Sequence, residues 1–158
     1  MSDRLPMTRA GYETLRERLA RLKTTDRREV SREIEIARGH GDLRENAAYD
    51  AAKNKQGMIE ANIRDMEDKL ARAEVIDVAS LSGERVLFGA TVLISDVKTE
   101  VEQTVQIVGE VEADTKAGRI SVTSPLARAL VGKNVGDTVK VQTPGGTKEY
   151  EIVNVVFR

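Results

Sequence analysis

The amino-acid sequence predicts an α+β protein in which an N-terminal antiparallel α-helical hairpin precedes a small α+β domain. Apolar residues recur at helical spacings of three and four through the first half of the 158 residues, and no proline occurs between Pro6 and Pro125. In the second half the apolar period falls to two, which is typical of strands. We therefore expect a coiled-coil stalk over residues 1–79 and a separate domain over residues 80–158.

The first helix should begin after Thr8, whose hydroxyl group can cap a helix N-terminus. The apolar positions that follow are Leu15, Leu19, Leu22, Val30, Ile34 and Ala37. Their pattern slips at Asp26 and then resumes. Such a slip resembles a stutter, which changes the local winding of a coiled coil without ending the helix.

The second helix has a cleaner seam with alternating spacings of three and four. Its positions are Tyr49, Ala52, Gln56, Ile59, Ile63, Met66, Leu70 and Ala73. A seam of this kind needs a partner helix, and the connection to the first helix is too short for anything but an antiparallel return. At 1.5 Å per residue, each arm of roughly 30 residues would reach about 45 Å.

The second half is expected to contain five short strands and one short helix. The strands are expected around residues 86–94, 104–108, 120–122, 138–142 and 150–157, and the helix over residues 125–131. Ser124 can cap this helix, and Pro125 suits its first position. A tight turn is expected at residues 144–146, Pro-Gly-Gly.

Composition excludes several classes of protein. The chain has no cysteine, which rules out a disulfide framework and thiolate metal sites and fits a cytoplasmic protein. The first six residues lack the apolar segment of a secretory signal, and no apolar run approaches the roughly 18 residues of a membrane span. A net charge of −1 and only five aromatic residues, three Tyr and two Phe, do not fit a generic nucleic-acid coat.

The most informative segment is the expected turn between the two helices, where Gly39-His40-Gly41 precedes Asp42 and Glu45. One interpretation is a capping box, because an Asp at N-cap and a Glu at N3 both satisfy backbone donors and favour the helix dipole. A cap, however, needs no long stalk beneath it, nor Arg44 and Asn46 beside it. The second interpretation is an acidic tip that completes a metal site offered by a partner, since two carboxylates supply too few of the six oxygens that Mg²⁺ prefers.

Segment 41–49, Gly-Asp-Leu-Arg-Glu-Asn-Ala-Ala-Tyr, together with Ala-Ala-Lys at 51–53, closely resembles the tip signature of the GreA/GreB family of bacterial transcript cleavage factors. The resemblance continues in order through segments 75–77, 88–92, 107–109, 121–125, 130–133 and 143–146. Segment 53–57 and the charge-balanced stalk are similar to the GreA branch. The resemblance implies an N-terminal antiparallel coiled coil and a C-terminal FKBP-like domain that binds RNA polymerase.

The resemblance also implies a function. Such a factor binds bacterial RNA polymerase, inserts its coiled coil into the secondary channel and stimulates the polymerase's own cleavage of backtracked RNA, rescuing stalled complexes. Asp42 and Glu45 would be the catalytic tip carboxylates, sharing Mg²⁺ with the polymerase active site, and no cofactor would be bound stably by the free protein. Arg44 and Asn46 would contact the RNA or the polymerase. The second partner would be the 3′ end of the nascent RNA. The protein would not be an enzyme by itself. It would bind no membrane, and it would be monomeric when free.

Further site residues follow from the same resemblance. Arg38 and Lys53 match the family's small basic patch and would contact extruded RNA phosphates, although they could equally be solvated flanks of the coiled coil. Ser124, Pro125 and Leu126 match the segment that grips the polymerase rim, although they could equally be no more than a helix start.

Two alternative functions stay open. The first is a regulator that occupies the secondary channel without promoting cleavage, against which the intact pair of Asp42 and Glu45 argues. The second is an independent metallohydrolase, which the sequence supports poorly because it has no cluster of His and carboxylate ligands.

Overall fold

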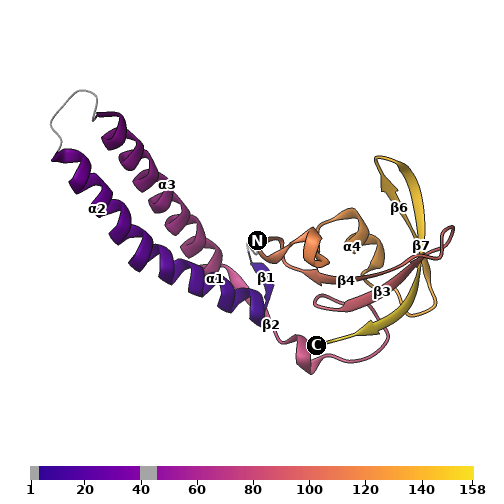
Figure 1. Ribbon diagram of the computed structural model, residues 1–158. Helices are drawn as coiled ribbons and strands as arrows, with labels where there is room; N and C mark the ends of the chain where they lie inside the picture. Colours follow the sequence, from indigo (N-terminus) through magenta and orange to yellow (C-terminus); the bar gives the residue numbers. More distant parts are fainter. Residues whose placement is uncertain (1–3, 40–45) are drawn as a thin grey trace. The chain divides into compact units, whose positions relative to one another are not determined.

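The computed structural model describes residues 4–39 and 46–158 (Figure 1). The chain divides into two compact units: Met1–Gly11 with Ala73–Arg158, called here the sheet unit, and Tyr12–Arg72, called the stalk. The expected α+β class is confirmed. We expected a domain boundary between residues 79 and 80, where the sequence changes from a helical to a strand-rich pattern, and that boundary stays a prediction.

The stalk consists of two helical arms. The first arm comprises α1 (Arg9–Arg21), a π-helical segment η1 (Leu22–Asp26) and α2 (Arg27–Arg38), and the second is α3 (Asn46–Ala71). The predicted cap is confirmed, because the Gly11 N–H donates to the Thr8 hydroxyl oxygen at 3.1 Å. No helix within the described ranges combines the length and the apolar character that a membrane span requires.

The slip in the first arm coincides with η1. Leu22 and Val30 are eight positions apart, one more than a heptad, and a π-helical turn accommodates one extra residue. The helix continues through the slip, as predicted, and Leu22 and Val30 both reach the seam. They form a buried cluster with Ile59 and Ile63 of α3.

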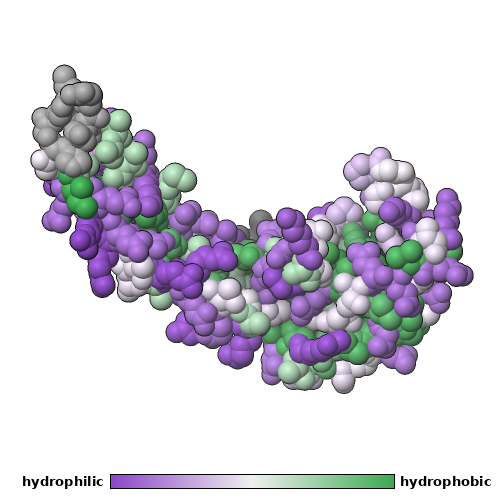
Figure 2. Space-filling model, viewed as in Figure 1, coloured by the Kyte–Doolittle hydropathy of each residue, from purple (hydrophilic) through white to green (hydrophobic). Residues whose placement is uncertain are grey.

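The two arms are antiparallel, as predicted. Ion pairs among the described residues connect them at Lys23–Glu67 (2.7 Å), Arg27–Glu60 (2.8 Å) and Lys55–Glu33 (3.1 Å). Residue numbers rise along the first arm as they fall along the second, which only an antiparallel hairpin allows. Hydrophilic residues cover most of the stalk face in view (Figure 2).

The sheet unit contains one two-stranded and one five-stranded sheet. In the smaller sheet β1 (Leu5–Thr8) pairs in parallel with β2 (Ala73–Ile76). The larger has the order β5-β4-β3-β7-β6, with only β4 and β5 parallel. Its strands are β3 (Thr91–Asp96), β4 (Glu102–Val108), β5 (Arg119–Ser121), β6 (Thr138–Thr143) and β7 (Gly146–Val156).

Two local expectations were wrong. Ala73 was expected on the helical seam, but α3 ends at Ala71 and Ala73 begins β2, because its backbone finds a partner in Leu5 of β1. The first strand was expected from residue 86 onward, but β3 begins only at Thr91. Val86 is nevertheless completely buried, which explains its apolar character.

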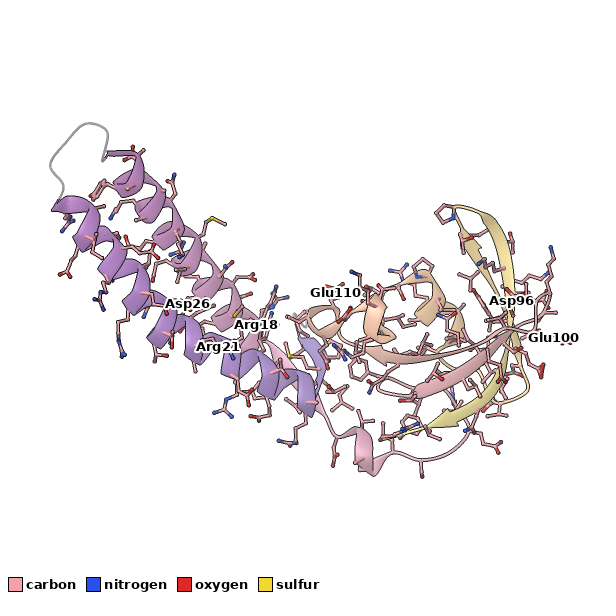
Figure 3. All side chains as sticks on the ribbon, in the orientation of Figure 1. Arg18, Arg21, Asp26, Asp96, Glu100 and Glu110 are labelled. Atoms are coloured by element: carbon pink, nitrogen blue, oxygen red, sulfur yellow. The ribbon has the colours of Figure 1, made fainter. Side chains whose placement is uncertain are left out.

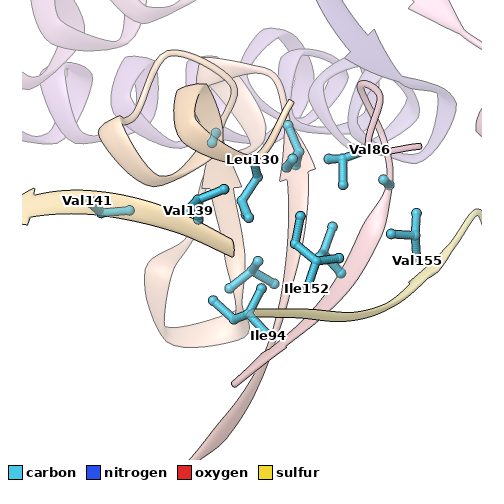
Figure 4. Close-up of a cluster of buried hydrophobic side chains, with 12 residues drawn as sticks. Val86, Ile94, Leu130, Val139, Val141, Ile152 and Val155 are labelled. Carbon is cyan, nitrogen blue, oxygen red and sulfur yellow. The ribbon is translucent and has the colours of Figure 1, made fainter. Parts of the chain in front are cut away.

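The core of the sheet unit lies between the five-stranded sheet and the short helix α4 (Pro125–Leu130) (Figure 4). Its fully or nearly fully buried members are Val86, Ala90, Val92, Ile94, Val105, Ile107, Ala127, Leu130, Val139, Val141, Ile152 and Val155. Val92 and Ile94 are completely buried while Leu93 between them is not, the alternation expected of a strand with one covered face. The core thus gives α4 a fixed place on the sheet.

Candidate functional site

The predicted acidic tip lies between the two arms of the stalk. The chain from residue 40 to residue 45 connects the end of α2 at Arg38 and Gly39 to the start of α3. Asp42, Arg44 and Glu45 lie outside the described residues, so their predicted roles stay predictions. Asn46 is the first residue of α3.

The two helix ends that flank the tip are joined by an aromatic contact. The guanidinium carbon of Arg38 lies 5.9 Å from the centroid of the Tyr49 ring, within the range of a cation–π interaction. The contact links the last residue of α2 to the first turn of α3. Tyr49 was predicted only as a seam residue, and its added role as the partner of Arg38 was not visible in the spacing.

Arg38 and Lys53, the predicted basic patch, occupy matching places on the two arms. Each directly follows a buried alanine of the seam, Ala37 or Ala52. Both side chains are exposed, and within the described ranges neither forms an ion pair. The Lys53 ammonium group donates to the Gln56 side-chain oxygen at 3.1 Å. Exposed cations at these positions could contact RNA phosphates, and they could equally be solvated residues that flank the seam of the coiled coil. Both interpretations stay open.

Below the tip, a paired hydrogen bond fixes the register of the arms. Arg27 donates through Nε and Nη2 to the two carboxylate oxygens of Glu60, both at 2.8 Å. This hydrogen bonding lowers the pKa of Glu60 below its ordinary value and raises the pKa of Arg27. Because Arg27 is the first residue after η1, the pair sets the register directly after the π-helical turn.

Residues 124–126, the predicted polymerase-rim segment, form the start of α4. Ser124 caps the helix, since its hydroxyl oxygen accepts from the Ala127 N–H at 3.3 Å and its hydroxyl donates to the Ser121 carbonyl at 2.7 Å. Leu126 packs against the sheet core, whereas Pro125 at the first helical position is exposed. The helix-start role is confirmed, and a contact with polymerase stays a prediction that rests mainly on Pro125.

Within the part of the chain that the structure describes, no group of three or more His, Cys, Asp or Glu side chains could hold a metal ion. Asp42 and Glu45, the predicted ligands of a shared Mg²⁺, lie outside that part of the chain, so the metal site stays a prediction. The sequence pattern also gave no sign of Glu112, whose carboxylate accepts from Thr8, 104 positions away in the chain, and from the nearby Gly109 N–H. Gly11, near Thr8, and Gly109 are the positions where the absence of a side chain indicates a close approach.

Both halves of the chain match one family of proteins. Residues 5–75 match the family described as Transcription elongation factor, N-terminal (GreA_GreB_N), and residues 81–157 match Transcription elongation factor, GreA/GreB, C-term. Together the two regions span nearly the whole chain, and they confirm the resemblance seen in the tip signature.

Relatives that are similar over nearly the full length of the chain agree with this match. Over 153 residues the chain is 60% identical to "Transcription elongation factor GreA" of Phenylobacterium zucineum, which covers 97% of this chain and 98% of the relative. It is 56% identical over 156 residues to the protein of the same name from Beijerinckia indica, covering 99% of both. The crystal structure of GreA factor homolog 1 (Gfh1) of Thermus thermophilus is 31% identical, covers 97% of this chain and 99% of its own, and has a TM-score of 0.44.

Proposed function

We propose a function that follows from the family to which the chain belongs, the GreA/GreB transcription elongation factors. The protein binds bacterial RNA polymerase, enters its secondary channel with the stalk and stimulates the polymerase's own cleavage of backtracked RNA. The extruded RNA 3′ end is its second partner. It acts in the cytoplasm as a monomer and is not an enzyme alone.

The observation that supports this proposal is the acidic pair on a two-helix stalk. The 26 residues of α3 correspond to about 39 Å of helix. Two packed helices are only about 20 Å across, since each has a diameter of about 10–12 Å with its side chains. A projection of this shape can carry two carboxylates into a channel that a globular domain cannot enter.

The chemistry of the acidic pair fits a shared magnesium ion. Mg²⁺ prefers six oxygen ligands and commonly binds through one or two carboxylates plus phosphate oxygens and water. Asp42 and Glu45 would supply those carboxylates, while the polymerase, the RNA and water would supply the rest. In phosphodiester hydrolysis a metal ion activates the attacking water or stabilises the leaving oxygen.

The chain's other tip residues would position the RNA. Arg44 and Asn46 would contact the RNA or neighbouring polymerase groups. Arg38 and Lys53 would neutralise phosphates of the extruded strand, and the contact between Arg38 and Tyr49 keeps this cation at the tip end of the stalk. In the sheet unit, the exposed Pro125 at the start of α4 would contribute to polymerase binding.

A cleavage assay on backtracked complexes with labelled RNA tests the proposal. The variants are Asp42→Asn and Glu45→Gln, because Asn caps a helix as well as Asp and Gln serves at N3. Asp50→Asn is the matched control, since it removes one exposed acid from the first turns of the same helix. Loss of a residue that hydrogen-bonds a metal ligand already lowers metal affinity or activity about 10- to 100-fold. Each tip variant should therefore lose at least that much of the stimulation of cleavage, while Asp50→Asn should retain it.

The outcomes separate the alternatives. If both tip variants stimulate cleavage normally, the metal assignment is wrong and the capping box was their only role. If the unmodified protein binds the stalled complex without shortening its RNA, the protein is a non-cleaving regulator of the channel. Shortening of naked RNA in the absence of polymerase would instead identify an independent hydrolase.

A further inference from the structure

Glu112 binds the segment from which the stalk begins. It is the last residue of the short 3₁₀ segment η4 (Glu110–Glu112). One of its carboxylate oxygens accepts from the backbone N–H of Thr8 at 2.9 Å and from that of Gly109 at 3.2 Å. The other accepts from the Thr8 hydroxyl group. All of these groups lie in the sheet unit.

The Thr8 hydroxyl group connects Glu112 to the first turn of α1 by hydrogen bonds. It donates to Glu112 and at the same time accepts from the N–H of Gly11, in the first turn of α1. Thr8 is only 7% exposed, so water competes little for these hydrogen bonds. It also ends β1, where its backbone lies opposite Ile76 of β2. A carboxylate beside a helix N-terminus is favoured by the helix dipole as well.

Two glycines provide the room for this arrangement. A Cβ atom on Gly11 would lie 2.2 Å from the carboxylate carbon of Glu112, and a Cβ atom on Gly109 would lie 2.0 Å from the carbonyl oxygen of Pro6. Neither position can hold a side chain unless a neighbour moves. The close approach of α1's first turn to the carboxylate therefore depends on Gly11.

All three partners of Glu112 are donors. The two backbone N–H groups can only donate, and the Thr8 hydroxyl donates to Glu112 while its oxygen accepts from Gly11. A carboxylate accepts at both oxygens, whereas an amide that accepts from the two N–H groups turns its NH₂ group toward Thr8 and leaves the hydrogen of the Thr8 hydroxyl without this acceptor. Glutamine has nearly the shape of glutamate but the wrong hydrogen-bonding character here.

We propose that Glu112 is a positioning residue: it holds the first turn of α1, from which the stalk continues, at the end of β1. This inference rests on the proposed function. Residue 12 and those after it form the stalk, so a displacement of Gly11 moves the residue from which the stalk starts. A mutation far from the reacting atoms that misplaces the reacting groups by about 1 Å can cost about 100-fold in rate.

The test compares Glu112→Gln with Glu110→Gln, its matched control, in the backtracked-complex assay. Glu110 lies in the same turn (Figure 3), and among the described residues its carboxylate accepts only from the exposed Thr123 hydroxyl group, at 3.2 Å. We expect Glu112→Gln to lower the cleavage rate at saturating factor about 10-fold or more, with little change in the half-saturating concentration. Glu110→Gln should leave both unchanged.

Variants of the partners guard against a simple folding defect. Thr8→Ser keeps the hydroxyl group and should behave as the parent, whereas Thr8→Val has a similar shape and should behave like Glu112→Gln. Gly11→Ala leaves Glu112 intact and introduces a better helix former, yet it should also lower the saturating rate because it displaces the carboxylate. Amide hydrogen exchange at Gly11 should accelerate in Glu112→Gln and in Thr8→Val.

Three results would overturn the inference. They are an unchanged saturating rate in Glu112→Gln, a rise in half-saturating concentration without a fall in rate, and a Gly11→Ala variant as active as the parent. Failure of the unmodified protein to stimulate cleavage would refute the proposed function instead. The exchange of Gly11 would still report in that case whether Glu112 holds the first turn of α1.

Discussion

Replacement of Ile63 by alanine tests which forces hold the two arms of the stalk together. Ile63 is 2% exposed and belongs to a cluster of four buried residues with Leu22, Val30 and Ile59. The change removes three carbon atoms, worth about 2.4 kcal/mol of transfer free energy at about 0.8 kcal/mol per carbon. A cavity adds to this loss, although two helices with no third layer can partly close it. We therefore expect a loss of about 2–3 kcal/mol, at the low end of the usual range for Ile→Ala.

The matched control is Met58→Ala on the same helix. Met58 is 68% exposed, so its truncation should change the free energy of unfolding by less than about 0.5 kcal/mol. Urea unfolding followed by far-UV circular dichroism gives the total loss. Amide hydrogen exchange resolved by residue should place that loss in α2 and α3 and leave the five-stranded sheet unchanged, because the stalk is a separate compact unit.

Two results would refute this reasoning. Equal losses for Ile63→Ala and Met58→Ala would mean that burial in the seam does not stabilise the stalk. A loss below about 1 kcal/mol for Ile63→Ala, combined with a strong salt dependence of the parent, would assign the stability to the ion pairs between the arms. Exposed ion pairs ordinarily contribute little and are screened by salt.

Three further predictions concern single side chains. Ser124→Ala should lower the stability of the sheet unit by about 1 kcal/mol in urea unfolding, because the Ala127 N–H loses its cap, while Ser124→Asp should retain it. Hydrogen bonds from Arg27 lower the pKa of Glu60, so the pair stabilises the stalk at pH values above 4.5, the ordinary pKa of a glutamate, and this stabilisation is lost as the pH falls through the lower pKa of the folded protein. In Glu60→Gln this loss of stability at acid pH should disappear, which unfolding measurements across this pH range would show. Glu100, at the turn between β3 and β4 (Figure 3), has a φ of 61°, a left-handed conformation that asparagine tolerates better than glutamate. Glu100→Asn should therefore increase the stability by up to about 1 kcal/mol and raise the temperature of thermal unfolding. An unchanged unfolding temperature would show that this backbone is not strained.

The candidate site was predicted from local signals and from the family resemblance, and the roles of its residues stay predictions. Asp42 and Glu45 stand three positions apart after a glycine-containing break, and their significance came from motif and spacing. Arg38 and Lys53 were assigned to the same site because they lie near the tip on opposing arms and match the family's basic patch. The contact between Arg38 and Tyr49 could not be predicted, because it depends on how the two helices pack at the tip end of the stalk.

The sequence by itself determined the helical hairpin, its seam and the cap of α4. Each of these depends on residues within a few positions of one another, through a repeat of three and four or through a serine three residues before the N–H it accepts from. The sequence also showed a slip at Asp26. It did not show that a π-helical turn absorbs it, since that outcome depends on Leu22 and Val30 both packing against α3.

Only the tertiary structure decided which distant segments meet inside the sheet unit. β1 pairs with β2 across nearly seventy positions of sequence, and Glu112 meets Thr8 at a separation of 104. Four-residue strands have too little periodicity to be recognised, and one glutamate in a charged chain gives no sign of its partner. Such contacts form because buried backbone donors need acceptors, and only the folded chain determines which acceptor is near.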